Sequence, residues 1–374
     1  ALGVTFMRLR VLERTDLLRR DARHAAVARQ LDAQRELLLA TALLHDVGHF
    51  PFSHLMEETI GVDHEAWGVR LILDPDSEVH RVLRAHDPGY PGQIAAILQR
   101  TYKPAYAVKL ISSQLDVDRL DYLLRDSIHT GVGYGKFDLD WLLHSLRIVE
   151  AGDGYEVAVD EHKGLQGAES SGLARSSWYQ PVSHHRLERA AGALLLKLLQ
   201  RARQRLAEGG LRRTPAPVRT LLRDPEALTL GDFRQLTDAL MRHAIWQWTE
   251  ANDPVMADLA RRFVARRLLK TLPMSRADYE RRRPELEALA RDHGFDPAHY
   301  LVHDSAVVSP YREGLFDPAQ REAGQSLFLV DDQGRLTDLS QRSALIAALQ
   351  RTPTTLERLC LPEPLRDAVV ALGN

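Results

Sequence analysis

The segment between Leu37 and His54 constrains the fold of this chain more than any other part of the sequence. An apolar run with the spacing of a buried helix ends at Leu44, and three histidines and an aspartate follow within ten residues. Imidazole and carboxylate groups at the end of a buried helix suit a divalent metal ion. From these residues alone, the alternative is a solvated, histidine-rich helix end. The second half of the segment reads His45-Asp46-Val47-Gly48-His49-Phe50-Pro51-Phe52-Ser53-His54.

Apolar periodicity predicts a mainly α fold. Residues 1–146 carry apolar side chains at helical spacing, and prolines divide this region into short helices. Residues 147–160 instead alternate around a glycine-containing turn and predict a small β-hairpin. Residues 164–299 are predicted to be helical again, and residues 300–374 mix short strands with a helix near 343–349. The fold class is therefore mainly α, with a small β-hairpin and a C-terminal α+β appendage.

Composition excludes several classes of protein. The single cysteine, Cys360, excludes an internal disulfide and a thiolate zinc site and fits a reducing, cytoplasmic compartment. No apolar run is long enough to span a bilayer, and no signal peptide is visible. The net charge of -2 gives no global attraction for nucleic acid. One basic cluster is interpreted as a solvated face: Arg261, Arg262, Arg266, Arg267 and Lys270.

A second group of polar residues lies between Gln114 and Ser127. On a helix, a carboxylate, a phenol, a guanidinium and a second carboxylate share one face, which suits a metal and an anionic sugar phosphate. The alternative is a salt-bridged surface helix, although such helices usually carry Lys and Glu rather than Asp and Tyr. The polar face holds Asp118, Tyr122, Arg125 and Asp126, and the predicted buried stripe holds Val117, Leu120, Leu124 and Ile128.

Together these motifs resemble the HD-domain phosphohydrolases, and more narrowly the bacterial form of the deoxynucleotide triphosphohydrolase branch. A lone His-Asp dipeptide does not identify this family, whereas the ordered set of motifs is a strong indication of it. The resemblance covers most of residues 1–200 and implies an HD-domain helical core. It rests on His45-Asp46, Gly48-His49, Pro51-Phe52-Ser53-His54, His64-Glu65, Asp116 to Tyr122, Arg125-Asp126, Ser127 to Asp138, and Arg175 through Trp178-Tyr179 to Val182 and His185.

The resemblance implies one divalent metal ion held by His45, Asp46 and Asp118, with Mg, Mn, Fe, Ni, Co and Zn not distinguished. The fourth ligand in this family is a histidine in a His-x-Leu-Gly-Val segment. The chain opens Ala1-Leu2-Gly3-Val4, so that histidine is expected directly before Ala1. His24 is interpreted as a surface residue.

The resemblance also assigns residues to catalysis and to substrate binding. His64 is expected to protonate the leaving oxygen, with His54 and Glu57 as its hydrogen-bonding partners and His49 at the α-phosphate. The family more often has Asp where Glu57 stands. The expected substrate contacts are Arg119 to phosphate, Tyr122 and Asp126 to the sugar, Arg175 to the terminal phosphate, and Tyr179 and His185 along the pocket.

The implied reaction converts a dNTP and water into a deoxynucleoside and triphosphate by attack at the α-phosphorus. Two alternatives remain open: a phosphohydrolase for other nucleotides (mono- or diphosphates, cyclic nucleotides or alarmones), and a catalytically weak nucleotide-binding regulatory module. Nucleic-acid binding is not indicated.

The resemblance further implies a homo-oligomer, either a dimer or a tetramer. The predicted regions are an HD core at 1–146, a hairpin at 147–163, a helical region at 164–299 that completes the active site and the oligomer interface, and an α+β subdomain at 300–374.

Overall fold

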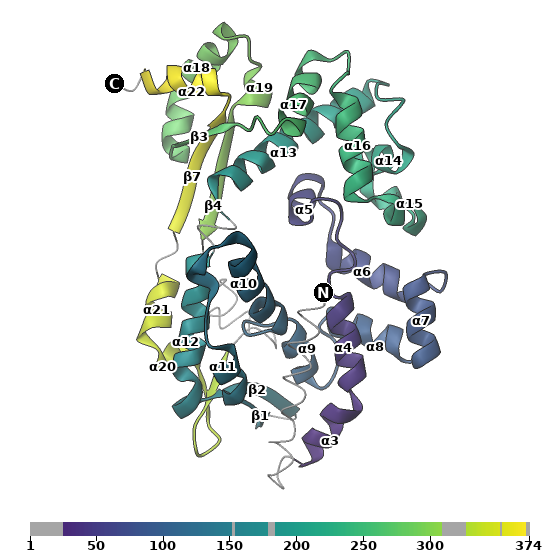
Figure 1. Ribbon diagram of the computed structural model, residues 1–374, viewed down its shortest axis with the longest axis vertical. Helices are drawn as coiled ribbons and strands as arrows, with labels where there is room; N and C mark the ends of the chain where they lie inside the picture. Colours follow the sequence, from purple (N-terminus) through teal and green to yellow (C-terminus); the bar gives the residue numbers. More distant parts are fainter. Residues whose placement is uncertain (1–24, 152–153, 179–183, 309–326, 352–353, 372–374) are drawn as a thin grey trace. The chain divides into compact units, whose positions relative to one another are not determined.

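The computed structural model shows a mostly helical chain with two small sheets, as the sequence predicts (Figure 1). It describes residues 25–151, 154–178, 184–308, 327–351 and 354–371. No helix within these ranges is long and apolar enough to cross a membrane. The chain forms two compact units: unit 1 comprises residues 1–48, 64–182 and 308–354, and unit 2 comprises residues 49–63, 183–307 and 355–374.

Helix α4 (Arg35–Leu44) anchors the first core of unit 1. Its sequence is rich in Leu and Ala, which are strong helix formers. It buries Leu37, Leu38 and Ala42 in a cluster shared with α8 (Tyr90–Leu98). The apolar face of α4 is therefore packed in this core, which fixes the position of the helix end. The other helices of this region are α3 (Ala25–Ala33), α6 (His64–Leu73), α7 (Glu78–His86) and α9 (Ala105–Ile111).

Helix α10 (Val117–Thr130) carries the second group of polar residues. Asp116 caps its N-terminus by accepting a hydrogen bond from the Arg119 N–H, and Gly131 ends it with a left-handed φ of 73°. The predicted buried stripe is partly wrong, because Ile128 is 74% exposed and Ser127 is buried in its place. Ser127 packs against Gly135, where a Cβ would lie 2.3 Å from the serine Oγ. The 3₁₀ turn Gly133–Gly135 thus covers this face of the helix.

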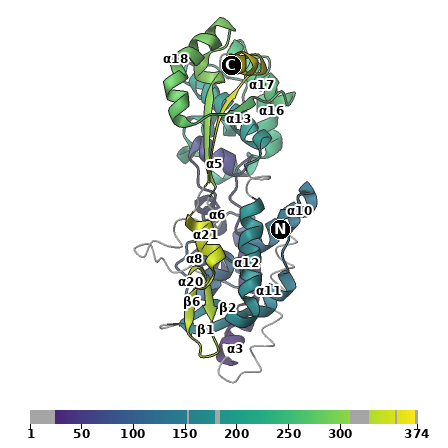
Figure 2. The same ribbon diagram turned by 90° about the vertical axis from the view of Figure 1, so that its left-hand side faces the viewer.

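The predicted hairpin is confirmed as β1 (Leu146–Ala151) paired antiparallel with β2 (Gly154–Asp160). Strand β2 also pairs in parallel with β5 (Phe328–Val330), which pairs with β6 (Leu336–Asp338). Figure 2 shows β1, β2 and β6 beside the lower end of α12 and below α20 and α21. The described part of residues 308–351 therefore belongs to unit 1. The remaining helices here are α11 (Leu139–Ser145), α12 (Glu161–Trp178), α20 (Leu339–Arg342) and α21 (Ala344–Arg351).

Unit 2 is built around the long helix α13 (Arg186–Ala207) and a three-stranded sheet. The strand β3 (Lys270–Pro273) interrupts the predicted helical region because it pairs with β7 (Thr354–Leu361), which is distant in sequence. The third strand is β4 (Val302–Val308). The helices of unit 2 besides α13 are α5 (His54–Ile60), α14 (Ala216–Arg223), η3 (Pro225–Ala227), α15 (Leu230–Gln235), α16 (Asp238–Trp248), α17 (Pro254–Val264), α18 (Arg276–Asp292), α19 (Pro297–Tyr300) and α22 (Glu363–Ala371).

Candidate metal centre

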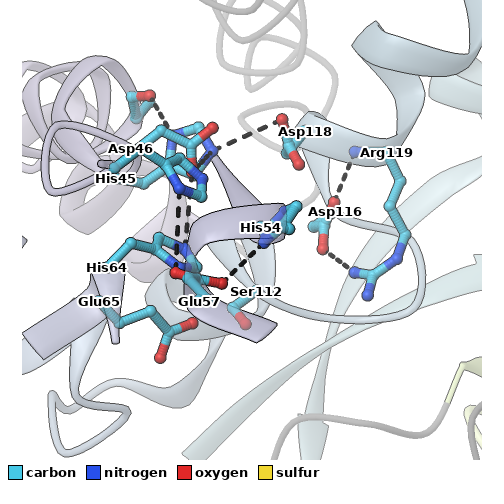
Figure 3. A network of polar contacts seen from close by, with 12 residues as sticks. His45, Asp46, His54, Glu57, His64, Glu65, Ser112, Asp116, Asp118 and Arg119 are labelled. Carbon is cyan, nitrogen blue, oxygen red and sulfur yellow. Dashed lines mark hydrogen bonds and ion pairs between the residues drawn. The ribbon is translucent and has the colours of Figure 1, made fainter. Parts of the chain in front are cut away.

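The end of α4 and the start of α10 bring the three predicted metal ligands together in unit 1 (Figure 3). His45 directly follows α4, and its Nδ1 lies 3.0 Å from the Ala42 carbonyl oxygen. Its Nε2 lies 3.1 Å from Oδ1 of Asp46 and 3.5 Å from Oδ1 of Asp118. Asp118 comes from the first turn of α10. One imidazole nitrogen is thus held by the helix, and the other is directed at two carboxylates.

Two opposing influences act on the protonation of His45. Burial lowers the pKa of the imidazole, but the carboxylates of Asp118 and Asp46 outweigh burial and raise that pKa to about 10. The site therefore favours a positive charge at Nε2. A proton and a divalent cation compete for this position.

The geometry fits a divalent cation. When the proton of His45 is on Nδ1, where it donates to the Ala42 carbonyl, Nε2 presents its lone pair to the carboxylates. Nε2 is buried and has no hydrogen-bond partner of suitable geometry among the described residues. The three donor atoms lie within 4.8 Å of one another. Such a set can close around an ion with ligand distances of about 2.0–2.2 Å.

His64 lies beside this group in unit 1. It is the first residue of α6, and its Nε2 lies 4.0 Å from Oδ1 of Asp46. The loop after Asp46 passes very close to α6 at Gly48. A Cβ at Gly48 would lie 2.0 Å from the His64 carbonyl oxygen and 2.2 Å from the Gly68 nitrogen. Only glycine permits this contact, which fixes the distance between Asp46 and His64.

Sequence reasoning missed a network that holds the start of α6. Both carboxylate oxygens of Glu65 accept hydrogen bonds from Arg100, at 3.2 and 2.9 Å. The same guanidinium donates to the Ser112 hydroxyl at 3.1 Å. Arg100 has a positive φ of 62° just beyond α8. Residue spacing near Glu65 does not reveal Arg100, because Arg100 lies 35 positions away in the sequence, after α8.

The residues His49, His54 and Glu57 belong to unit 2 and lie close together at α5. Nδ1 of His54 lies 2.9 Å from Oε2 of Glu57, and Nδ1 of His49 lies 3.9 Å from Oε1 of the same side chain. The two imidazole rings meet edge to face, with centroids 4.8 Å apart. Glu57 therefore contacts the His54 imidazole directly and lies near the imidazole of His49.

Arg119 and Arg175 line the same narrow cavity of unit 1, together with Gln114. Arg119 donates to the Asp116 carboxylate and to the Ser113 carbonyl oxygen. Arg175 is buried and donates to Oε1 of Gln114 at 2.8 Å. Both guanidinium groups thus contact the segment that leads into α10. Their predicted role at the phosphates stays a prediction.

The remaining predicted substrate contacts fall in three places. The Tyr122 ring packs against Trp178, with centroids 5.2 Å apart. Partial burial raises the pKa of the nearby Asp126 carboxyl, and the charge of Arg125 opposes that rise. His185 lies in unit 2, where it caps α13 by accepting the Leu187 N–H. Tyr179 and His24 lie outside the described residues.

Comparison with known proteins identifies relatives of this chain. The HD domain family matches residues 9–126. The chain is 36% identical over 334 residues to YwfO, an uncharacterized protein of Bacillus subtilis (strain 168), and the match covers 89% of this chain and 75% of YwfO. It is 31% identical over 147 residues to a deoxyguanosinetriphosphate triphosphohydrolase-like protein of Rhodopseudomonas palustris (strain HaA2). That match covers 37% of this chain and 34% of the relative.

A solved structure shares the fold of nearly the whole chain. It is the crystal structure of a phosphohydrolase from Bacteroides thetaiotaomicron VPI-5482, which superposes with a TM-score of 0.74. The alignment covers 97% of this chain and 86% of that chain, at 23% sequence identity. At this identity, the likeness concerns the fold alone.

Proposed function

Since the chain belongs to the HD-domain phosphohydrolase superfamily, and to the same family as YwfO, we propose that it hydrolyses dNTPs to a deoxynucleoside and triphosphate. Water attacks the α-phosphorus, the bond between phosphorus and the 5′-oxygen breaks, and the 5′-oxygen takes a proton. The motifs shared with deoxynucleotide triphosphohydrolases support this substrate class. The partial likeness to a deoxyguanosinetriphosphate triphosphohydrolase-like protein agrees with it.

One observation carries the proposal. Nε2 of His45 is directed at Asp46 and Asp118, while Nδ1 is held by the Ala42 carbonyl. An adjacent His-Asp pair alone has little specificity, and the approach of Asp118 from a separate helix supports a site for a cation. A divalent cation bound there supplies Lewis acidity and lowers the pKa of a bound water.

The other residues have roles that require no metal contact. His64 donates the proton to the departing 5′-oxygen, and Oδ1 of Asp46 lies 4.0 Å from its Nε2. Glu57 orients His54 and His49, and His49 contacts the α-phosphate. Arg119 and Arg175 neutralise the polyphosphate. Tyr122 and Asp126 contact the sugar, and Tyr179 and His185 line the pocket.

Product analysis tests the reaction. The full-length protein is incubated with each dNTP, each NTP, nucleoside mono- and diphosphates, and cyclic nucleotides, in Mg²⁺, Mn²⁺ or Co²⁺, and the products are separated by anion exchange. We expect a deoxynucleoside and intact triphosphate. In water enriched in ¹⁸O, attack at phosphorus places the label in triphosphate and leaves the 5′-hydroxyl unlabelled.

Other outcomes contradict the proposal in distinct ways. Orthophosphate as the first product indicates stepwise removal of phosphate, and turnover of a cyclic nucleotide or a monophosphate alone indicates a different substrate. Nucleotide binding without turnover in any metal indicates a regulatory module.

A further inference from the structure

Unit 2 contains a cavity that His185 borders, and the other residues that line it have no role in the proposed reaction. Its volume is about 950 Å³, and it lies between α13, α16, the end of α17 and the segment that follows it. Most of the wall is apolar, with Leu187, Ile245, Trp246 and Phe263 among the lining residues. Cavities of this size and character bind organic molecules rather than water or a single ion.

The wall includes apolar side chains that the unit 2 fold leaves accessible. Trp246 is 55% exposed, Leu187 is 51% exposed and Val264 is 48% exposed. All three line the same cavity, although they come from three different elements. Single exposed apolar residues are ordinary on protein surfaces, but a group of them around one hollow indicates a binding surface.

Two cationic groups lie on this apolar wall without a counter-charge. Arg242 comes from α16, and Arg266 follows α17 with a positive φ of 52°. Within the described residues, neither guanidinium forms an ion pair with a carboxylate, although most arginines of unit 2 helices α13, α17 and α18 do. The one carboxyl in the wall is Glu188.

We propose that this cavity binds an amphipathic anion, namely an apolar molecule that carries one acidic head group. The apolar wall accommodates the body of the ligand, and Arg242 and Arg266 bind its head. A nucleoside triphosphate fits the charges less well, because two arginines and one carboxyl cannot balance a polyphosphate. A medium-chain carboxylate matches both the apolar lining and the small net positive charge of the two arginines and one carboxyl.

Calorimetric titration with straight-chain carboxylates tests the proposal. Octanoate, decanoate and dodecanoate are each titrated into the full-length protein, below their micelle-forming concentrations. We expect affinity to rise about fourfold for each added methylene that is buried. Decanol, which has the same chain and no charge, should bind at least tenfold more weakly than decanoate.

Variants localise the binding. The double substitution Arg242→Gln and Arg266→Gln should weaken decanoate at least tenfold while changing decanol little. Trp246→Ala should weaken both ligands, since it removes part of the apolar wall. The matched control is Arg261→Gln with Arg267→Gln, which removes two exposed arginines of the same segment that do not line the cavity. This control should bind decanoate like the unmodified protein.

Three results would overturn the proposal. If decanoate binds the Arg242→Gln, Arg266→Gln variant as tightly as it binds the unmodified protein, its binding site lies elsewhere. A deoxynucleotide that competes with decanoate and loses its own binding in that variant identifies a nucleotide site. An oligomer that binds no decanoate, together with a Trp246→Ala variant that sediments as a monomer, identifies the cavity as an interface between copies of the chain.

Discussion

At the residue scale, the metal site depends on how neighbouring side chains are made to converge. Adjacent residues on a helix point about 100° apart, so their side chains must bend toward each other to share an ion. His45 directly follows α4 with helical dihedral angles, and its Nε2 lies 3.1 Å from Oδ1 of Asp46. The sequence identifies the ligand types, whereas the hydrogen bond to Ala42 is visible only in the structure.

Replacing Asp118 tests the ligand set. We expect Asp118→Asn to lower bound metal by at least about 100-fold in affinity and to lower turnover of the substrate in parallel. The measurement is metal content after dialysis, together with product formation. Asp332→Asn is the matched control, because Asp332 lies 3.3 Å from His162 in an exposed His-carboxylate pair of unit 1. Equal metal loss in both variants would contradict the assignment.

Glu188 gives unit 2 a pH dependence that can be measured. Burial raises the pKa of its carboxyl from 4.5 to about 7, against the opposing charge of Arg189 and with the support of Glu58. Between pH 4.5 and about pH 7, the Glu188 carboxyl keeps its proton in the folded chain and loses it in the unfolded chain. Stability contributed by this group therefore falls as the pH rises from about 4.5 to about 7.

Glu188→Gln should remove this effect. The variant should gain on the order of 2 °C in unfolding temperature at pH 8 and close to nothing at pH 4.5, since partial solvent exposure of the residue screens the effect. Thermal denaturation of both proteins at the two pH values provides the measurement. A larger gain at pH 4.5 than at pH 8 would show that the sign is wrong.

At the scale of elements, the close approach of a loop to α6 sets the position of His64. We expect Gly48→Ala to destabilise the fold by several kcal/mol, because the new Cβ meets backbone atoms at 2.0 and 2.2 Å and not a flexible side chain. Turnover should fall as well, since the start of α6 must move. Chemical denaturation and steady-state kinetics measure the two effects.

Gly92→Ala is the control for that substitution. Gly92 lies within α8, and a Cβ there meets no atom within 4 Å. Alanine in a helix interior is favoured over glycine by about 1 kcal/mol, so this variant should be equally or more stable than the unmodified protein. Comparable losses in both variants would mean that the close approach at Gly48 is unimportant.

At the scale of the whole molecule, structure that depends on neighbouring residues can be predicted from the sequence. Pairings between distant segments cannot. The mainly α fold and the hairpin follow from periodicity within short windows. The strand β3 was missed because its pairing partner β7 lies far along the chain. For the same reason, sequence alone did not show that β5 joins β2 in unit 1. Arg100 was missed because its contact with Glu65 joins separate helices.

Because the two units have separate cores, metal binding should stabilise one region of the chain before the other. Leu37 and Ile94 belong to a core of unit 1, whereas Leu286 and Leu359 belong to one of unit 2. A cation that binds only the folded site stabilises it by about 2.7 kcal/mol at a concentration of 100 times its Kd. Since the ligands come from unit 1, the added stability should appear first there.

Hydrogen exchange tests this regional effect. After removal of metal by chelation, addition of Mn²⁺ should slow exchange by about 100-fold at the end of α4 and the start of α10, where opening must release the ion. Asp118→Asn should abolish the slowing, and Asp332→Asn should retain it. Slower exchange in Asp118→Asn would place the ion elsewhere. An unchanged rate in the unmodified protein would mean that these two helix ends hold no metal.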